Sequence, residues 1–133
     1  MLIKYARQEA LRYKLSRNKD IPCEQLVSRL CELKQGYTQH GGLRPFAVSF
    51  LYASYDDDRG YQLFHSQASG FYMAMKACAA GRSGGIQGDL ERFYTEDLDL
   101  REVSSLAIHV LMKVKDPGLD CKSLFVCFGM PKV

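Results

Sequence analysis

The run from Gly36 to Ser49, GYTQHGGLRPFAVS, constrains the fold more than any other stretch of this 133-residue chain. Its Gly-Gly pair accepts positive φ without steric cost, so a helix can end and the chain can reverse direction there. Its proline pushes Arg44 out of the α region into an extended conformation. Phe46 then begins an apolar, alternating segment of the kind that forms a buried strand. The run predicts a junction between a helix and a strand.

Two helices are predicted before this junction. Leu2–Leu15 reads as the first, with Leu2, Ala6, Glu9 and Tyr13 along one side. Pro22 fits the first position of the second helix, where its missing N–H is not needed. The spacing i, i+3, i+4, i+7 on that helix is followed by Cys23, Leu26, Val27, Leu30, Cys31, Lys34 and Tyr37. Because the turn between the helices is short, we expect an antiparallel hairpin.

Three strands are predicted after the junction: Phe46–Ser54, Tyr61–Ser66 and Phe71–Ala80. The loops between them, Asp56–Gly60 and Gln67–Gly70, contain the residue types of hairpin turns. The strands should therefore form an antiparallel meander.

Helical patterns resume in the last third of the chain. One helix is predicted over Ile86–Tyr94, and a second opens near Asp99 and ends at Asp116-Pro117-Gly118. The apolar stripe of the second consists of Val103, Leu106, Ala107, Val110, Leu111 and Val114. A last short strand is predicted over Leu124–Phe128. The order ααβββααβ predicts an α+β fold in which helix pairs flank an antiparallel sheet, with one face of a sandwich missing.

Composition sets limits on the class of protein. The net charge is +3, and the surplus lies in the first forty residues, so neither nucleic acid nor a membrane is required as a partner. The five cysteines include no CxxC pair, which indicates reduced thiols in a cytosolic or nuclear protein. No apolar run is long enough to span a bilayer, and no signal-peptide core follows Met1.

Candidate sites for metals and cofactors are weak. The three histidines lack ligand spacing, which argues against zinc. Asp56-Asp57-Asp58 lacks the glutamate and the ligand alternation of a calcium loop. The run Gly81–Gly85, GRSGG, lacks the Lys-Ser/Thr ending of a phosphate-binding loop. We therefore expect no metal and no cofactor.

The sequence of the chain resembles that of one family, the α subunits of the eukaryotic 20S proteasome core. The similar segments are Ile21–Val27 (IPCEQLV), Leu30–Gln35 (LCELKQ), Tyr37–Gln39, the Gly-Gly pair and Arg44–Ser49 (RPFAVS), in the family's order and spacing. Tyr61–Phe64 and Ser69-Gly70 continue the resemblance, which extends over about residues 1 to 115. Among the seven α types, the Ile-Pro-Cys-Glu-Gln run is most similar to that of the third-position subunit.

The resemblance implies part of an N-terminal-nucleophile-hydrolase fold, an αββα sandwich whose first strands are missing here. Residues 1–133 would then be a single partial domain that lacks the N-terminal gate segment and the C-terminal end. With a sheet face and edge strands uncovered, we expect the isolated monomer not to be stable. The family's RPFG glycine is Ala47 here, and its Gly-Gly-Trp is Met73-Ala74-Met75, which adds bulk wherever space is short.

The resemblance also implies a non-catalytic function. The catalytic β subunits use an N-terminal threonine, and the threonines here, Thr38 and Thr95, are internal. The family's role is to scaffold the α ring for ubiquitin-dependent protein degradation in the cytoplasm and nucleus, with other α subunits and the β ring as partners. The helix pair, in the family, faces the β ring. The interface or structural residues we expect are Cys23, Leu26, Leu30, Tyr37, Arg44 and Phe46.

Two alternatives remain open from the sequence. The chain could be a truncated or degenerate fragment of such a subunit with no assembled role. It could also be an unrelated small α/β enzyme that uses Cys31 and His40. Ordinary packing within the domain is an equally good explanation for each of the six interface residues.

Overall fold

The computed structural model describes residues 1–39, 44–79, 85–114, 127 and 129. The chain divides into two compact units, 1–76 and 77–133, which are described separately. The predicted strand over Leu124–Phe128 and the predicted helix end at Asp116–Gly118 lie outside the described residues. None of the helices in these ranges is long and apolar enough to cross a membrane.

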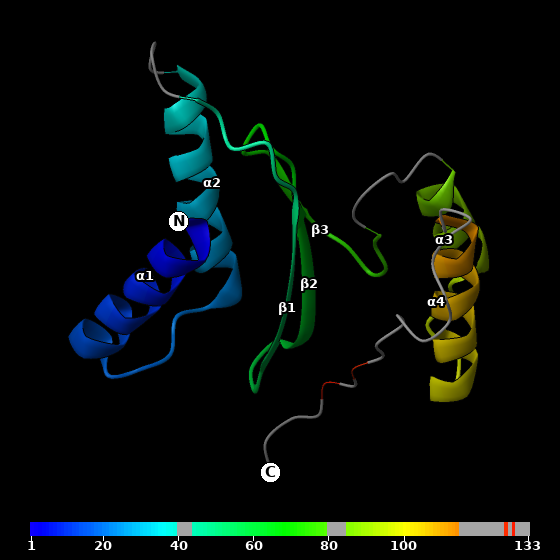
Figure 1. Ribbon diagram of the computed structural model, residues 1–133. Helices are drawn as coiled ribbons and strands as arrows, with labels where there is room; N and C mark the ends of the chain where they lie inside the picture. Colours follow the sequence, from blue (N-terminus) through cyan, green and yellow to red (C-terminus); the bar gives the residue numbers. More distant parts are fainter. Residues whose placement is uncertain (40–43, 80–84, 115–126, 128, 130–133) are drawn as a thin grey trace. The chain divides into compact units, whose positions relative to one another are not determined.

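Two helices open the first unit, α1 (Leu2–Arg17) and α2 (Cys23–Gln39). They run in broadly opposite directions, as the short connection predicts (Figure 1). Asn18 ends α1 in the left-handed conformation, with φ 52°, and its N–H donates to the Lys14 carbonyl at 2.8 Å. Pro22 lies one position before α2 rather than at its first residue, because its carbonyl accepts the first helical bond, from Leu26 N–H.

The predicted meander is confirmed as a three-stranded antiparallel sheet in the order β1-β2-β3. Its strands are β1 (Phe50–Asp56), β2 (Gly60–Ser66) and β3 (Tyr72–Ala74). β1 and β2 pair over seven positions, from Phe50 with Ser66 to Asp56 with Gly60. Gly60 has φ +69°, a conformation that glycine accepts readily at this tight turn.

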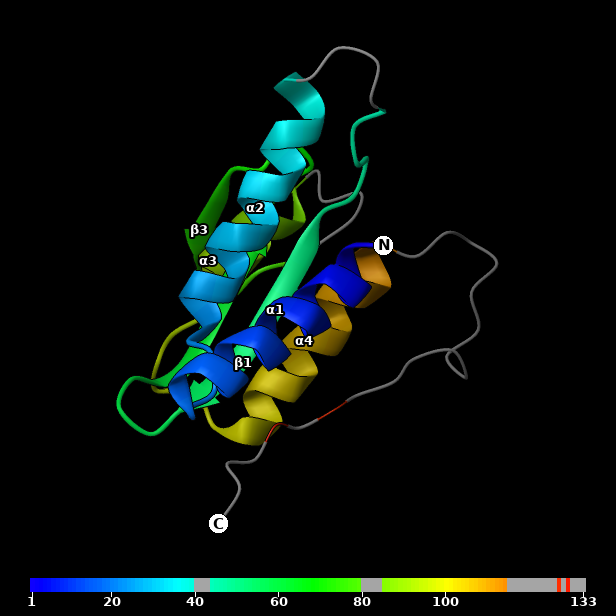
Figure 2. The ribbon, with the colours of Figure 1, turned by 90° about the vertical axis from the view of Figure 1, so that its left-hand side faces the viewer.

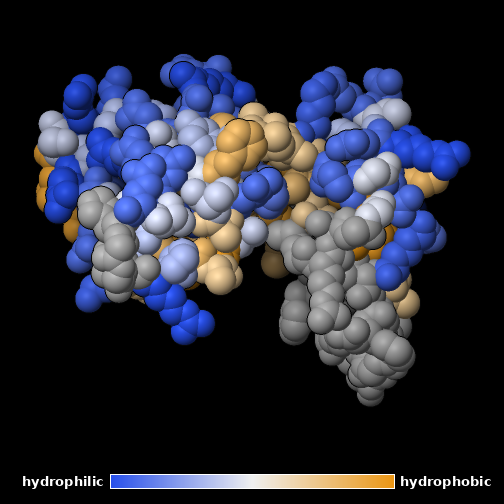
Figure 3. Space-filling model, turned by 90° about the horizontal axis from the view of Figure 1, so that it is seen from above, coloured by the Kyte–Doolittle hydropathy of each residue, from blue (hydrophilic) through white to orange (hydrophobic). Residues whose placement is uncertain are grey.

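One face of the sheet packs against α2, as Figure 2 shows. Its core consists of Val27, Cys31 and Phe64, with Cys23, Tyr52 and Tyr72 packed around it. The side chains of the opposite face alternate with these, and several are exposed: Leu51, Tyr55, Tyr61 and Met73. In the view of Figure 3, most of the surface is hydrophilic and the hydrophobic side chains gather in patches.

The structure corrects two strand boundaries. β1 begins at Phe50 and not at Phe46, because residues 46–49 extend beyond Ser66, where β2 ends, and have no strand beside them in the described chain. β3 covers Tyr72–Ala74 and not Phe71–Ala80. Its ladder closes with one further bond, from Met75 N–H to the Leu63 carbonyl at 2.8 Å, after which the chain leaves the sheet.

The second unit contains α3 (Ile86–Phe93) and α4 (Leu100–Val114), close to the predicted bounds. Asp99 caps α4: its carboxylate accepts from Leu100 N–H at 2.7 Å, and Glu102 accepts from Asp99 N–H at 2.9 Å. The core of this unit consists of Ile86, Leu90 and Val110, with Ala77, Ala79 and Leu106 around it. Of the predicted stripe, Val110 is buried, whereas Ala107 and Leu111 are exposed.

Candidate interface on the helix pair

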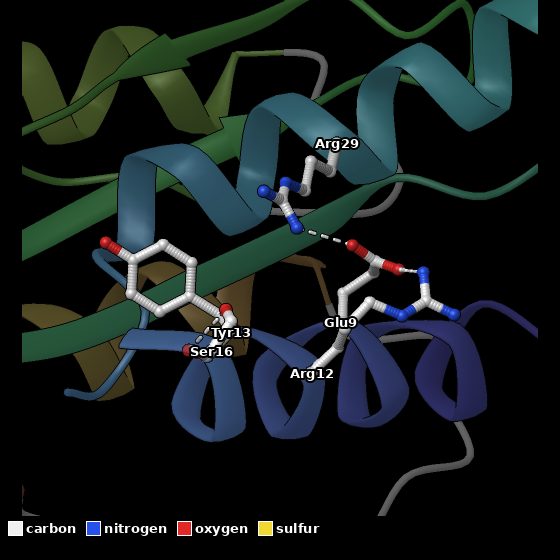
Figure 4. A network of polar contacts seen from close by, with 5 residues as sticks. All are labelled: Glu9, Arg12, Tyr13, Ser16 and Arg29. Carbon is white, nitrogen blue, oxygen red and sulfur yellow. Dashed lines mark hydrogen bonds and ion pairs between the residues drawn. The ribbon is translucent and has the colours of Figure 1, made fainter. Parts of the chain in front are cut away.

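A buried carboxylate joins the two helices of the first unit. Glu9 of α1 is 5% exposed and accepts from Arg29 of α2 at 2.5 Å and from Arg12 at 2.6 Å (Figure 4). Each carboxylate oxygen receives one guanidinium N–H, so the buried charge is compensated. The pair of helices is therefore held by a specific polar contact as well as by apolar packing at Leu2 and Leu30.

We expect Glu9→Gln to lower the free energy of unfolding by about 1–3 kcal/mol, because two charged hydrogen bonds are weakened at a buried position. Arg12→Ala is the matched control. The Arg12 side chain is 76% exposed, so its loss should cost less than about 1 kcal/mol. Urea unfolding followed by circular dichroism measures both. If the two substitutions lowered the free energy of unfolding equally, the contact between Glu9 and Arg29 of α2 would contribute nothing to stability.

A second polar contact fixes α2 to the sheet. The Lys34 side chain is fully buried, and its ammonium donates to Ser66 Oγ at 2.8 Å and to the carbonyls of Val48 and Gln67 at 3.2 Å each. The same ammonium lies 4.8 Å from the centre of the Phe50 ring, in cation–π geometry. One side chain thus connects α2 to the segment before β1, to the end of β2 and to the turn that follows β2.

Burial shifts the titration of this cluster. It lowers the pKa of Lys34, against the opposing influence of the Cys31 thiol. It raises the pKa of Cys31 and of Tyr52, whose hydroxyl lies 3.1 Å from Ser66 Oγ. A thiol that is buried and held neutral is a poor nucleophile. The enzyme hypothesis, which needs Cys31 as a nucleophile, therefore loses its support, and its partner His40 lies outside the described residues.

The turn between β2 and β3 rests directly on α2. A Cβ atom at Gly70 would lie 2.7 Å from the Cys31 carbonyl oxygen and 2.5 Å from Cγ of Gln35. Gly70 also has φ +90°, where other residues are strained. The absence of a side chain at this position is what lets the turn approach the helix so closely.

The structure places five of the six predicted interface residues in packing contacts or beside a groove within the first unit. Cys23 packs against the core, Leu30 is buried, and Leu26 lines a groove beside α1. The rings of Tyr37 and Phe46 lie 4.5 Å apart, so this pair connects the end of α2 to the segment after the junction. Arg44 is exposed and has no hydrogen bond or ion pair within the described ranges.

Sequence reasoning missed the roles of Glu9 and Lys34. Their positions were predicted, Glu9 on the same side of its helix as Leu2 and Lys34 in the apolar stripe of α2, but their roles were not. A charged residue on an apolar stripe is the signal that could have identified them, because such a residue is buried only when it is paired. No group of three or more potential metal ligands gathers among the described residues.

Comparison with known proteins identifies the family of this chain. The proteasome subunit family matches residues 1–123, and the chain belongs to that family. Within the family it is similar to α-type subunits. It is 50% identical over 117 residues to a probable proteasome subunit α type-3 of Schizosaccharomyces pombe, covering 87% of this chain and 47% of the relative.

Two further relatives give the same result. Proteasome subunit α type-3 of Saccharomyces cerevisiae is 48% identical over 117 residues, which cover 87% of this chain and 45% of the relative. Proteasome subunit α type-4-2 of rice (Oryza sativa subsp. indica) is 49% identical, with 87% and 47% covered. The chain thus spans about half the length of these relatives. They are α-type subunits, a class that is not catalytic, in agreement with the expectation that the chain is not an enzyme.

Proposed function

We propose that this chain acts as a non-catalytic structural component of the α ring of the 20S proteasome core, and so serves ubiquitin-dependent protein degradation. The observation that supports this most strongly is the match of residues 1–123 to the proteasome subunit family together with α-type relatives at 48–50% identity. In this proposal the chain is one partial domain of the N-terminal-nucleophile-hydrolase αββα sandwich, and it works in the cytoplasm and nucleus.

The partners we propose are neighbouring α subunits and the β ring. The helix pair is the surface we assign to the β ring, because α1 and α2 are fixed to each other through Glu9 and α2 is fixed to the sheet through Lys34. Such double fixation gives a rigid docking surface. The outward side of α1 carries exposed apolar residues that are available for the contact, among them Leu11 and Leu15. Cys23 and Leu30 would support this surface from inside, and Tyr37, Arg44 and Phe46 would hold the junction behind it.

Expression of a tagged copy in eukaryotic cells, followed by a native gradient probed for β subunits, tests the proposal. Migration at core-particle size together with β subunits is the expected result. Leu15→Glu, which places a charge on the outward side of α1, should reduce this co-migration at least severalfold. Leu100→Glu is the matched control, since Leu100 is also exposed, at the start of α4, and should not matter. Migration as an aggregate, or rapid loss of the protein, would support a fragment with no assembled role instead.

A further inference from the structure

The last turn of α1 and the connection after it form one continuous exposed segment. Every residue from Lys14 to Asp20 is exposed, and no residue of α1 after Glu9 is buried. The helix ends at Arg17, and Asn18 follows it in the left-handed conformation. A helix end without buried side chains opens at little cost, because few contacts resist the opening. This end of α1 can therefore unwind while the rest of the helix stays on α2.

Ser16 is the one hydroxyl-bearing residue between Lys14 and Asp20, and basic residues surround it. Its Oγ donates to the Tyr13 carbonyl at 3.1 Å, within one turn of the helix (Figure 4). The basic residues stand on both sides of it in sequence: Arg12, Lys14, Arg17 and Lys19. Lys14 pairs with Asp20, and Arg17 lies over the Tyr13 ring. The segment as a whole keeps an excess of positive charge.

An exposed serine among basic residues, at a helix end that can unwind, fits the substrate site of a serine kinase. Kinases choose their substrates partly by charge, so an acidic substrate site would attract this segment. The acceptor hydroxyl must also leave its local hydrogen bond, and the bond of Ser16 to Tyr13 lies in the turn that opens. Charge, exposure and local opening thus point to the same residue.

Ser28 of α2, the other serine of the helix pair, shows the opposite pattern. It is only partly exposed and lies one turn from Glu24 and from Glu32, and its hydroxyl donates to the Glu32 carboxylate at 3.3 Å. Arg29, the basic residue beside it, is bonded to Glu9. An acidic substrate site would be repelled by the two carboxylates near Ser28. The basic surroundings of Ser16 are therefore specific within the helix pair.

We propose that Ser16 is a phosphorylation site for a basophilic serine kinase, and that the phosphate loosens α1 from α2. In the reaction, the γ-phosphorus of ATP forms a bond to Ser16 Oγ and its bond to the bridging oxygen of ADP breaks. The hydroxyl proton passes to a carboxylate of the kinase. The proposal concerns a modification of the chain itself and does not depend on assembly into a ring.

The phosphate would act on α1 in two ways. It adds negative charge to the last turn, where the carbonyl end of the helix dipole is already negative. It also stands one turn after Arg12, which bonds the buried Glu9 at 2.6 Å. The phosphate and the Glu9 carboxylate would compete for this guanidinium, because the Arg12 side chain is exposed and can turn toward either. Glu9 would then keep its bond to Arg29 alone.

The test treats the full chain with the catalytic domain of protein kinase C, a basophilic serine kinase, and magnesium ATP. Tandem mass spectrometry locates the phosphate. We expect most of it on Ser16, and we expect Ser16→Ala to lose that share. Ser105→Ala is the matched control, since Ser105 is also exposed on a helix, and it should leave the incorporation unchanged. Phosphate at other residues but not at Ser16, or no phosphate at all, would overturn the proposal.

Charge variants separate recognition by charge from exposure alone. Arg17→Glu, next to the acceptor, should slow the phosphorylation of Ser16 about tenfold. Lys4→Glu makes the same change of charge at an exposed position of α1 about three turns away, and should slow it less than about twofold. Equal rates for the two variants would show that the basic residues around Ser16 do not recruit the kinase.

Cleavage by chymotrypsin tests the effect of the phosphate on α1. Cleavage after Tyr5, near the start of α1, should become at least about threefold faster in the phosphorylated chain, because the rate follows the population of the opened helix. Cleavage after Leu33, inside α2, should not change. In Arg12→Ala the phosphate should have a smaller effect, since the contact with Glu9 is already lost. An unchanged rate after Tyr5, or an equal rise after Leu33, would overturn the loosening of α1.

Discussion

Replacing Gly70 by alanine is expected to lower the free energy of unfolding by about 2–6 kcal/mol. Two causes add. The left-handed conformation at φ +90° costs a residue with a Cβ about 1–3 kcal/mol. The new Cβ would also stand 2.7 Å from the Cys31 carbonyl oxygen, and relieving such an overlap in a packed region costs about 1–3 kcal/mol. Urea unfolding followed by circular dichroism measures the change.

The control for this substitution lies on the helix that Gly70 touches. Gly36 is inside α2, and a Cβ there would meet nothing within 4 Å. Gly36→Ala should therefore stabilise the protein by about 0.5–1 kcal/mol, through helix propensity and a less flexible unfolded chain. The two Gly→Ala changes should have opposite signs. A loss below 1 kcal/mol for Gly70→Ala would mean that the turn can move away from α2 at little cost.

Removal of the buried lysine is expected to have the second large effect. Lys34→Ala leaves a cavity and removes the donor from the Val48 and Gln67 carbonyls, and we expect a loss of about 3–5 kcal/mol. Lys34→Met keeps most of the volume and should cost less, because the desolvation of the ammonium is also removed. Lys19→Ala, at an exposed position, should change stability by less than about 0.5 kcal/mol. If Lys34→Ala were as mild as Lys19→Ala, the ammonium would not hold α2 on the sheet.

The lowered pKa of Lys34 also predicts a dependence on pH. Between that pKa and the ordinary value of 10.5, the unfolded chain keeps the proton that the folded chain has lost, so the stability contributed by this group rises with pH. Cys31 and Tyr52 are acids with raised pKa values, so their contribution to stability falls with pH. Both residues are present in the unchanged chain and in Lys34→Met, so their contributions largely cancel when the two are compared. The destabilisation caused by Lys34→Met should therefore be larger at pH 10 than at pH 7. A smaller destabilisation at pH 10 than at pH 7 would contradict the lowered pKa of Lys34.

The helices and the meander were predictable because their signals are local. Apolar periodicity located α2 and α4, and turn residues located both hairpin loops. Asp99 was predicted to open the last helix, and it does so through the capping bonds with Leu100 and Glu102. Such features depend on residues three or four positions apart, which the sequence displays directly.

The start of β1 was not predictable, because it depends on a partner distant in sequence. Residues 46–49 have strand-like composition, but a strand requires a neighbour, and β2 ends opposite Phe50. The Val48 carbonyl accepts from Lys34 instead of from a strand. A cost of added bulk was expected only where space is short. Ala47, Met73 and Ala74 are exposed in this chain, so their side chains have room.

The candidate site was predicted only in part. Periodicity placed Leu26, Leu30 and Tyr37 on the inward side of α2, but whether an inward residue contacts its own sheet or lines an open groove depends on the angle between α1 and β1. That angle follows from three-dimensional packing, and no pattern in either segment encodes it alone.

The contacts of the two helices imply an order in which the elements of the first unit unfold locally. α1 rests on α2, with Leu2 and Glu9 as its buried residues, whereas α2 is attached both to α1 and, through Lys34 and the Gly70 turn, to the sheet. α1 can therefore swing away while α2 and the sheet stay together, but α2 cannot leave without releasing α1. We therefore expect α1 to be the first element of this unit to open in local unfolding, with its amides exchanging before those of α2.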